Sequence, residues 1–206
     1  MNPLHHREPG LVGLIAGPLA GREVETEQTE GGDAQVKADR GAEAPYFSII
    51  ADGIHLHPAA VAFAYRANPR RAMLITDATE LAGCPDGLYP GNAQNSGQHR
   101  KVGGRVTLAT TSPNNINTTS AEEETLIGSA AGLDTCVRNL MSSAGCTLAE
   151  AVRCVTENVA DFMGVKDRGR LEEGCRADFV VLGDEGEVLQ TWIAGEKAWD
   201  CGRPLS

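Results

Sequence analysis

The sequence predicts an α/β fold: part of a (β/α)8 barrel of the TIM type, followed by a short β-rich tail. Two short apolar runs, at residues 47–50 and 73–75, each lead into a segment that carries histidine or aspartate, DGIHLHP and TDAT. A stretch with helical character separates them. In an α/β barrel such segments lie at the same end of neighbouring parallel strands, where the active site is built.

The first elements form a β-α-β unit. The runs at 47–50 (FSII) and 73–75 (MLI) are short, apolar and bounded by turn residues, which is typical of buried strands. Residues 58–67 open with a proline, carry apolar side chains at helical spacing and end before Asn68-Pro69. We therefore expect a helix at 58–67 that connects two parallel strands.

Two polar tracts interrupt this pattern. Residues 21–45 are rich in Glu, Gly, Ala and Asp and poor in apolar side chains, which predicts a mobile surface insertion. Residues 83–124 predict a loop-rich region with one hairpin around 101–108, KVGGRVTL.

Two helices and three strands complete the prediction. Apolar residues from Leu133 onward mark a helix face, and Gly145 stands where a C-cap glycine belongs. Thr147 and Glu150 have the form of a capping box that starts a second helix, whose apolar face continues to Val155. The tail favours strands at 178–182, 188–193 and 197–199. We expect residues 1–170 to belong to the barrel and residues 171–206 to form strands of a small β-sandwich.

Composition excludes several classes of function. The formal net charge of −10 argues against nucleic acid or an anionic membrane surface as a partner. No apolar run approaches the roughly 20 residues of a membrane span, and the N-terminus lacks the features of a secretory signal. The six cysteines form no C-x-x-C pair, which is typical of reduced thiols. We expect a cytoplasmic enzyme rather than a binding module.

Five segments, read in order, carry a family resemblance: HHREPGLVGLI, IIADGIHLHPAAV, LITDAT, TLIGSAAGLD and GRLEEGCRADFVVL. They resemble the C-terminal half of the N-acetylglucosamine-6-phosphate deacetylase family of the amidohydrolase superfamily. The resemblance implies a metal-dependent barrel with a small β-sandwich. It also implies a homodimer that cleaves the acetamide of a 6-phosphorylated amino sugar.

The resemblance also implies that the ligands of the divalent metal, zinc or a similar ion, lie upstream of the stretch that matches this chain. We therefore expect no metal ligands here, and the ion is not expected to be retained by this chain. The alternative is a truncated, catalytically inactive fragment or pseudoenzyme subunit. The family pattern also differs at Ile127, where small residues are usual.

Asp77 is the candidate catalytic residue. An aspartate after a buried strand could merely cap the following turn, but the resemblance implies an acid/base that moves protons between water and the leaving amine. His55 and His57 alternate along the chain, so only one of them can face the site. The D-G-x-H pattern selects His55 as a substrate contact, and His57 is expected to be an ordinary loop histidine.

Two further elements are predicted to bind the substrate. Arg7 resembles a residue that grips the sugar phosphate, for which a forked guanidinium is well suited. Leu126, Ile127 and Gly128 precede a helix, where backbone N–H groups suit ligand contact. A plain helix N-cap at Ser129 is the alternative reading of that segment.

Overall fold

The structure is a computed structural model that describes residues 44–109 and 125–202. Arg7 and the predicted insertion at 21–45, except its last two residues, lie outside the described residues. The strands and helices, in chain order, are β1 (Phe47–Ile50), α2 (Pro58–Ala67), β2 (Ala72–Ile75), β3 (Gly87–Tyr89), β4 (His99–Val102), β5 (Arg105–Leu108), β6 (Leu126–Ser129), α3 (Leu133–Ala144), α4 (Leu148–Arg153), α5 (Glu157–Met163), β7 (Phe179–Leu182), β8 (Val188–Ile193) and β9 (Glu196–Asp200).

The predicted β-α-β unit is confirmed. β1 and β2 pair in parallel, with Phe47 opposite Ala72 and Ile50 opposite Ile75, and α2 connects them. The helix occupies the predicted residues, with proline in its first turn, where a missing N–H costs nothing. His57 is its N-cap: the ring Nδ1 accepts a hydrogen bond from the N–H of Ala59 at 3.1 Å.

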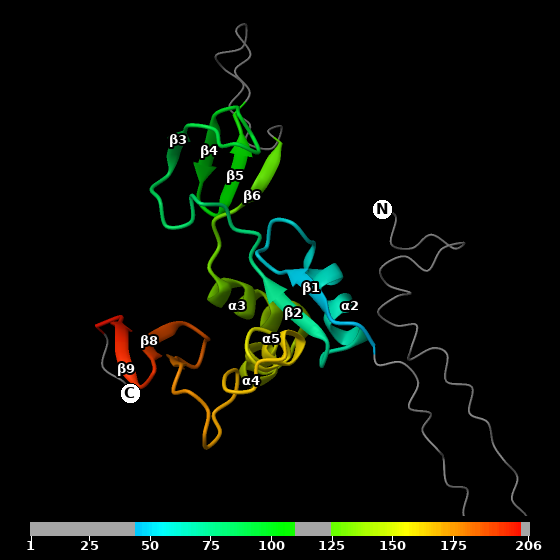
Figure 1. Cartoon of the computed structure of the whole chain (residues 1–206). Helices are drawn as coiled ribbons and strands as arrows, with labels where there is room; N and C mark the ends of the chain where they lie inside the picture. The colour runs from blue at the N-terminus through cyan, green and yellow to red at the C-terminus, as the bar shows by residue number, and fades with distance from the viewer. Residues whose placement is uncertain (1–43, 110–124, 203–206) are drawn as a thin grey trace, which may run out of the picture.

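The apolar core lies between this sheet and the helices. Ile49 of β1, Leu74 of β2 and Leu140 of α3 are almost fully buried and belong to one cluster. α2 packs against α3, and both α3 and α5 contact β2, which places these helices beside the strand (Figure 1). The unit that carries the predicted site therefore rests on a continuous core.

The two predicted helix signals after residue 130 are both present. α3 ends at Gly145, whose φ of 67° is left-handed and whose N–H donates to the carbonyl of Met141. Thr147 and Glu150 form the capping box of α4, with both reciprocal hydrogen bonds in place. The chain then departs from the prediction, because the helix stops at Arg153 instead of running through Val155. The carbonyl of Cys154 accepts from the N–H of Leu74 in β2 at 3.0 Å, so it is turned away from the helix axis.

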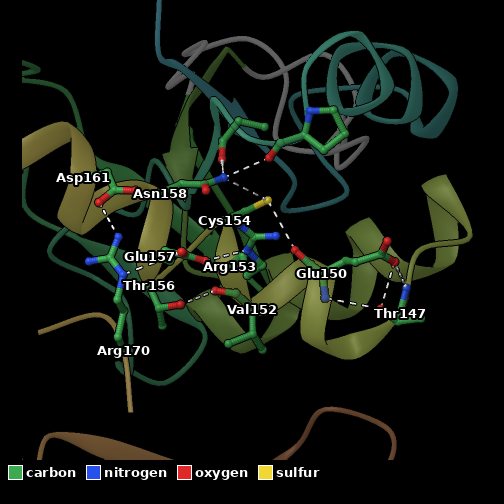
Figure 2. A network of polar contacts seen from close by, with 12 residues as sticks. Thr147, Glu150, Val152, Arg153, Cys154, Thr156, Glu157, Asn158, Asp161 and Arg170 are labelled. Atoms are coloured by element: carbon green, nitrogen blue, oxygen red, sulfur yellow. Dashed lines mark hydrogen bonds and ion pairs between the residues drawn. The ribbon is translucent and has the colours of Figure 1, made fainter. Parts of the chain in front are cut away.

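A polar network holds α5 in place after this break (Figure 2). Arg153 donates to Glu157 at 2.6 Å across the break, and Arg170 pairs with Asp161. Asn158 is buried and joins α5 to the start of β2 through two carbonyl groups.

The tract at 83–124 contains more than the predicted hairpin. β4 and β5 form that hairpin around Gly103 and Gly104, and β3 and β6 extend it into a four-stranded antiparallel sheet of order β3-β4-β5-β6. β3 and β6 are too short and have too few apolar residues to be predicted as strands from the sequence. Residues 110–124 lie outside the described residues. Figure 1 shows this sheet standing apart from the helices, and the chain enters and leaves it at adjacent points, since Ala78 bridges Ser129.

The tail forms a three-stranded antiparallel sheet, β7-β8-β9, in which the predicted strands 178–182 and 197–199 are observed with shifted ends and 188–193 as predicted. The rings of Phe179 and Trp192, opposite each other in β7 and β8, stack with centroids 5.5 Å apart. Across the described ranges no helix is long and apolar enough to cross a membrane. All six cysteines fall within these ranges and are free thiols.

Candidate functional site

His55 and Asp77 lie together at the carboxyl ends of β1 and β2, as predicted. Nε2 of His55 is 3.1 Å from Oδ2 of Asp77. On the other side of the ring, Nδ1 is 2.7 Å from Oδ2 of Asp52. The exposed fraction of the side chain rises along this chain of contacts, from 0% at Asp52 through 19% at His55 to 54% at Asp77. The arrangement thus runs from a buried carboxylate to an accessible one.

Local backbone geometry positions these groups. Asp77 has a φ of 49°, a left-handed conformation that aspartate tolerates better than most residues. This turn directs the chain out of β2 toward β6. Asp52 makes an Asx-type turn, in which Oδ1 accepts from the N–H groups of Ile54 at 2.9 Å and His55 at 3.0 Å.

Asp52 is ionised under ordinary conditions. Burial alone would raise the pKa of its carboxyl, but the hydrogen bonds from the backbone N–H groups of His55 and Ile54 and from the His55 ring outweigh burial and hold that pKa below its usual range. A negative charge therefore lies behind the histidine. Asp52 is one site residue that sequence reasoning missed, although it stands first in the D-G-x-H pattern.

The predicted substrate-binding segment is a strand and lies beside Asp77. Ser129 N–H donates to the carbonyl of Asp77 at 2.9 Å, and Thr79 N–H donates to the carbonyl of Ser129 at 2.8 Å. A Cβ atom added to Gly128 would come within 2.6 Å of Thr79 Cγ2. The close approach of β6 to the Asp77 turn therefore requires glycine at this position.

Ile127 occupies a register shift between β5 and β6. Val106 pairs with Gly128 and Thr107 pairs with Leu126, so Ile127 is skipped in the ladder. A bulge of this kind re-aims a side chain, and Ile127 lines the cavity beside Asp77. The helix-capping alternative for Ser129 is wrong: Gly132 is the N-cap of α3, and Ser129 Oγ donates to the carbonyl of Thr76 at 2.7 Å.

A polar cavity of about 200 Å³ opens at Asp77. Small-molecule sites usually enclose roughly 300–1,000 Å³, so this cavity is smaller than is usual for them. Its lining comes from the turn after β2, from the loop before β4, from the first residue of β4 and from β6: Asp77, Ala78, Thr79, Glu80, Asn92, Gln94, Asn95, His99 and Ile127.

His99 in this lining was not predicted from the sequence. It is 1% exposed, and its Nε2 lies 3.1 Å from the carbonyl of Asn95. A carbonyl accepts only, so Nε2 carries a proton. Nδ1, on the other side of the ring, is buried and has no hydrogen-bond partner within the described residues. A lone histidine in a tract with few apolar residues offers no sequence signal.

The described residues do not fit a metal ion. Residues 44–109 and 125–202 hold no group of three or more His, Cys, Asp or Glu side chains arranged for one, and both ring nitrogens of His55 face carboxylates. Leu126 lies in β6 but is not part of the cavity lining, and Arg7 is outside the described residues.

A family model that matches most of the chain defines the class of protein. The model of the amidohydrolase family matches residues 25–198, and the chain belongs to this family.

Two related proteins and one solved structure are similar to this chain over most of its length. The chain is 35% identical over 205 residues to N-acetylglucosamine-6-phosphate deacetylase of Danio rerio, covering 97% of this chain and 41% of that protein. It is 34% identical to N-acetylgalactosamine-6-phosphate deacetylase of Escherichia coli O157:H7, covering 96% of this chain and 42% of the relative. The crystal structure of N-acetylglucosamine-6-phosphate deacetylase from Thermotoga maritima matches with a TM-score of 0.68 and 27% identity, over 97% of this chain and 44% of that one. The chain thus spans about two fifths of the length of these relatives.

Proposed function

We propose that a protein containing this chain hydrolyses the acetamide of N-acetylglucosamine 6-phosphate to glucosamine 6-phosphate and acetate. Membership of the amidohydrolase family and the named relatives support the reaction class and the substrate. The single observation that carries the proposal is that Asp77 contacts His55 on one side and, together with Ile127 of β6, lines a cavity on the other. This is where a barrel of this kind has its active site.

In this proposal Asp77 is the catalytic proton carrier. Hydrolysis needs a proton taken from the attacking water and a proton given to the departing amine nitrogen, and one carboxylate can serve both steps in sequence. Asp77 is suited to the task because it is half exposed at the cavity and its Oδ2 faces a histidine nitrogen.

The remaining site residues hold the substrate. His55 is proposed to contact the sugar, and so is the segment Leu126, Ile127 and Gly128, of which Ile127 lines the cavity. Arg7 is proposed to bind the 6-phosphate, because a forked guanidinium matches phosphate geometry and the net charge of −10 otherwise repels an anion. Residues elsewhere in the protein are proposed to hold the divalent ion of the complete enzyme, because the family resemblance implies ligands upstream of the stretch that matches this chain.

The architecture is part of the same proposal. Residues 1–170 would complete a (β/α)8 barrel with further strands, and residues 171–206 would supply strands to a β-sandwich. Two of these complete enzymes would form a cytoplasmic homodimer.

Acetate release tests the proposal. The 206-residue chain and the longest in-frame product of its gene would each be incubated with the 6-phosphates of N-acetylglucosamine and N-acetylgalactosamine, and with unphosphorylated N-acetylglucosamine. Release from the phosphorylated sugar by the longer product, lost in Asp77→Asn, supports the proposal. A folded longer product that releases no acetate from either phosphate would favour an inactive subunit instead.

A further inference from the structure

Asp52 does more than close its turn. Oδ1 alone accepts both backbone N–H groups of the Asx-type turn, from Ile54 and His55. Oδ2 is left for a different contact, with Nδ1 of the His55 ring at 2.7 Å. The turn does not require this second contact. The contact acts instead on the imidazole ring of His55.

The contact fixes which ring nitrogen carries a proton. An ionised carboxylate oxygen only accepts hydrogen bonds, so Nδ1 must be the donor. Nε2 is then the nitrogen that faces Asp77, with 3.1 Å between Nε2 and Oδ2. If both of these atoms presented lone pairs they would repel each other, so the geometry accommodates one proton between them.

We propose that Asp52 is a positioning residue, which holds His55 in the Nδ1–H form so that Nε2 can take a proton from Asp77. This inference rests on the proposed function. In the step, the O–H bond of the Asp77 carboxylic acid breaks and an N–H bond forms at Nε2, which yields a carboxylate and an imidazolium. Asp52 and Asp77 balance the new positive charge from its two sides. The imidazolium then returns this proton to Asp77, which gives it to the departing amine nitrogen and is again the carboxylate that accepts a proton from water.

Asp52→Asn separates the two roles of this side chain. The carboxamide oxygen can still accept from the two turn N–H groups, whereas its NH₂ group would donate to Nδ1 and drive the ring proton to Nε2. A ring protonated at Nε2 already donates to Asp77 and can take nothing from it. An aspartate-to-asparagine change behind a catalytic histidine lowers kcat by about 10⁴ in serine proteases through the wrong tautomer.

The experiment reads the tautomer and the rate together. In ¹⁵N-labelled protein, the His55 signal is assigned by its loss in His55→Gln, and long-range ¹H–¹⁵N spectra report which nitrogen is protonated. We expect protonated Nδ1 in the wild type, protonated Nε2 in Asp52→Asn, and a fall in kcat of on the order of 10² or more with KM changed less than threefold. Asp86→Asn is the matched control. Asp86 likewise accepts a backbone N–H, from Gly103, and contacts a basic side chain, Lys101, but it does not line the cavity, so kcat should be unchanged.

The outcomes are separable. An unprotonated Nδ1 in the wild-type protein overturns the inference without any variant. So does an Asp52→Asn protein that switches tautomer yet keeps its kcat, or that loses rate only in step with a lower melting temperature. If the wild-type protein releases no acetate, the proposed function fails, while the wild-type tautomer still decides whether Asp52 holds the ring.

Discussion

The side-chain NH₂ of Asn158 in α5 donates to the carbonyl of Ala72, the first residue of β2, at 2.7 Å, and also to the carbonyl of Pro69 at 2.9 Å (Figure 2). Asn158 is 2% exposed, so these bonds form away from water. One amide thus anchors a helix to the strand that leads to Asp77.

Asn158→Asp should be strongly destabilising at neutral pH. It would place a carboxylate against two carbonyl oxygens in a buried site, at a cost of about 3 kcal/mol or more. Burial would raise the pKa of the new acid, so the penalty should shrink as the pH falls below that raised pKa and the protonated acid can donate one bond. Urea unfolding at pH 7 and pH 4 checks this. Gln98→Glu makes the same chemical change on the surface and should have little effect.

Asp77→Asn should lower kcat of the complete enzyme by on the order of 10² to 10⁴, with KM nearly unchanged, because a positioned proton carrier contributes about that much. Asparagine tolerates the left-handed φ of 49° at this position, so the variant removes the chemistry and retains the turn. Steady-state kinetics measured together with melting temperatures would distinguish a loss of catalysis from a loss of stability. An equal loss of rate and stability would contradict the catalytic role.

Gly128→Ala should disturb both the fold and the site. Its new Cβ would lie 2.6 Å from Thr79 Cγ2 and 3.1 Å from the carbonyl of Asp77. Thr79→Ser removes the closer atom, so the double variant should recover part of the stability lost in Gly128→Ala. A double-mutant cycle from chemical unfolding measures this coupling. Additive effects would show that the two side chains do not meet.

The capping box predicts a specific acid sensitivity. The pKa of Glu150 is lowered, chiefly by the hydrogen bond from the Thr147 backbone N–H. A depressed pKa in the folded protein stabilises it above the usual carboxyl pKa, about 4.3, and that contribution is lost as the pH falls through the folded-state pKa. Melting temperatures measured from pH 6 to pH 3 should therefore fall more steeply in the wild type than in Glu150→Gln. Parallel curves would exclude this role.

Arg7→Ala should act on recognition of phosphate alone. In the complete enzyme it should lower kcat/KM for the phosphorylated sugar by the loss of a charge-assisted pair, about 1.5–3 kcal/mol, and leave N-acetylglucosamine itself nearly unaffected. Inhibition by inorganic phosphate would measure phosphate binding independently, and it should be weaker in Arg7→Ala than in the wild type. An equal effect on both sugars would make Arg7 structural.

Much of the fold was predictable where the local sequence and the tertiary structure demand the same conformation. The helix at 58–67, the C-cap at Gly145 and the capping box at Thr147 all follow from nearest-neighbour chemistry. The end of α4 does not. No proline or glycine stands there, and the break accompanies a carbonyl of Cys154 that bonds to Leu74, far away in sequence.

The site divides in the same way. His55 and Asp77 could be paired from the sequence because the ends of adjacent parallel strands must meet. Asp52 was missed because an aspartate before glycine usually signals a turn, which it also makes here. His99 lines the cavity because β4 belongs to the sheet β3–β6. The full pairing of that sheet could not be predicted, because its strands show no periodic apolar pattern.

Thr79 and Ser129 stand where the chain leaves the α/β unit for the sheet β3–β6 and where it returns, and they are joined by a backbone hydrogen bond. This hydrogen bond holds the two ends of the excursion, residues 79–129, next to each other. The residues between the ends can therefore change in number or type without moving the ends. Ile127 and His99 belong to the excursion, whereas His55 and Asp77 belong to the scaffold beneath it. Such a division lets evolution or an engineer exchange the residues that we propose to contact the sugar while the proposed proton-handling pair stays in place.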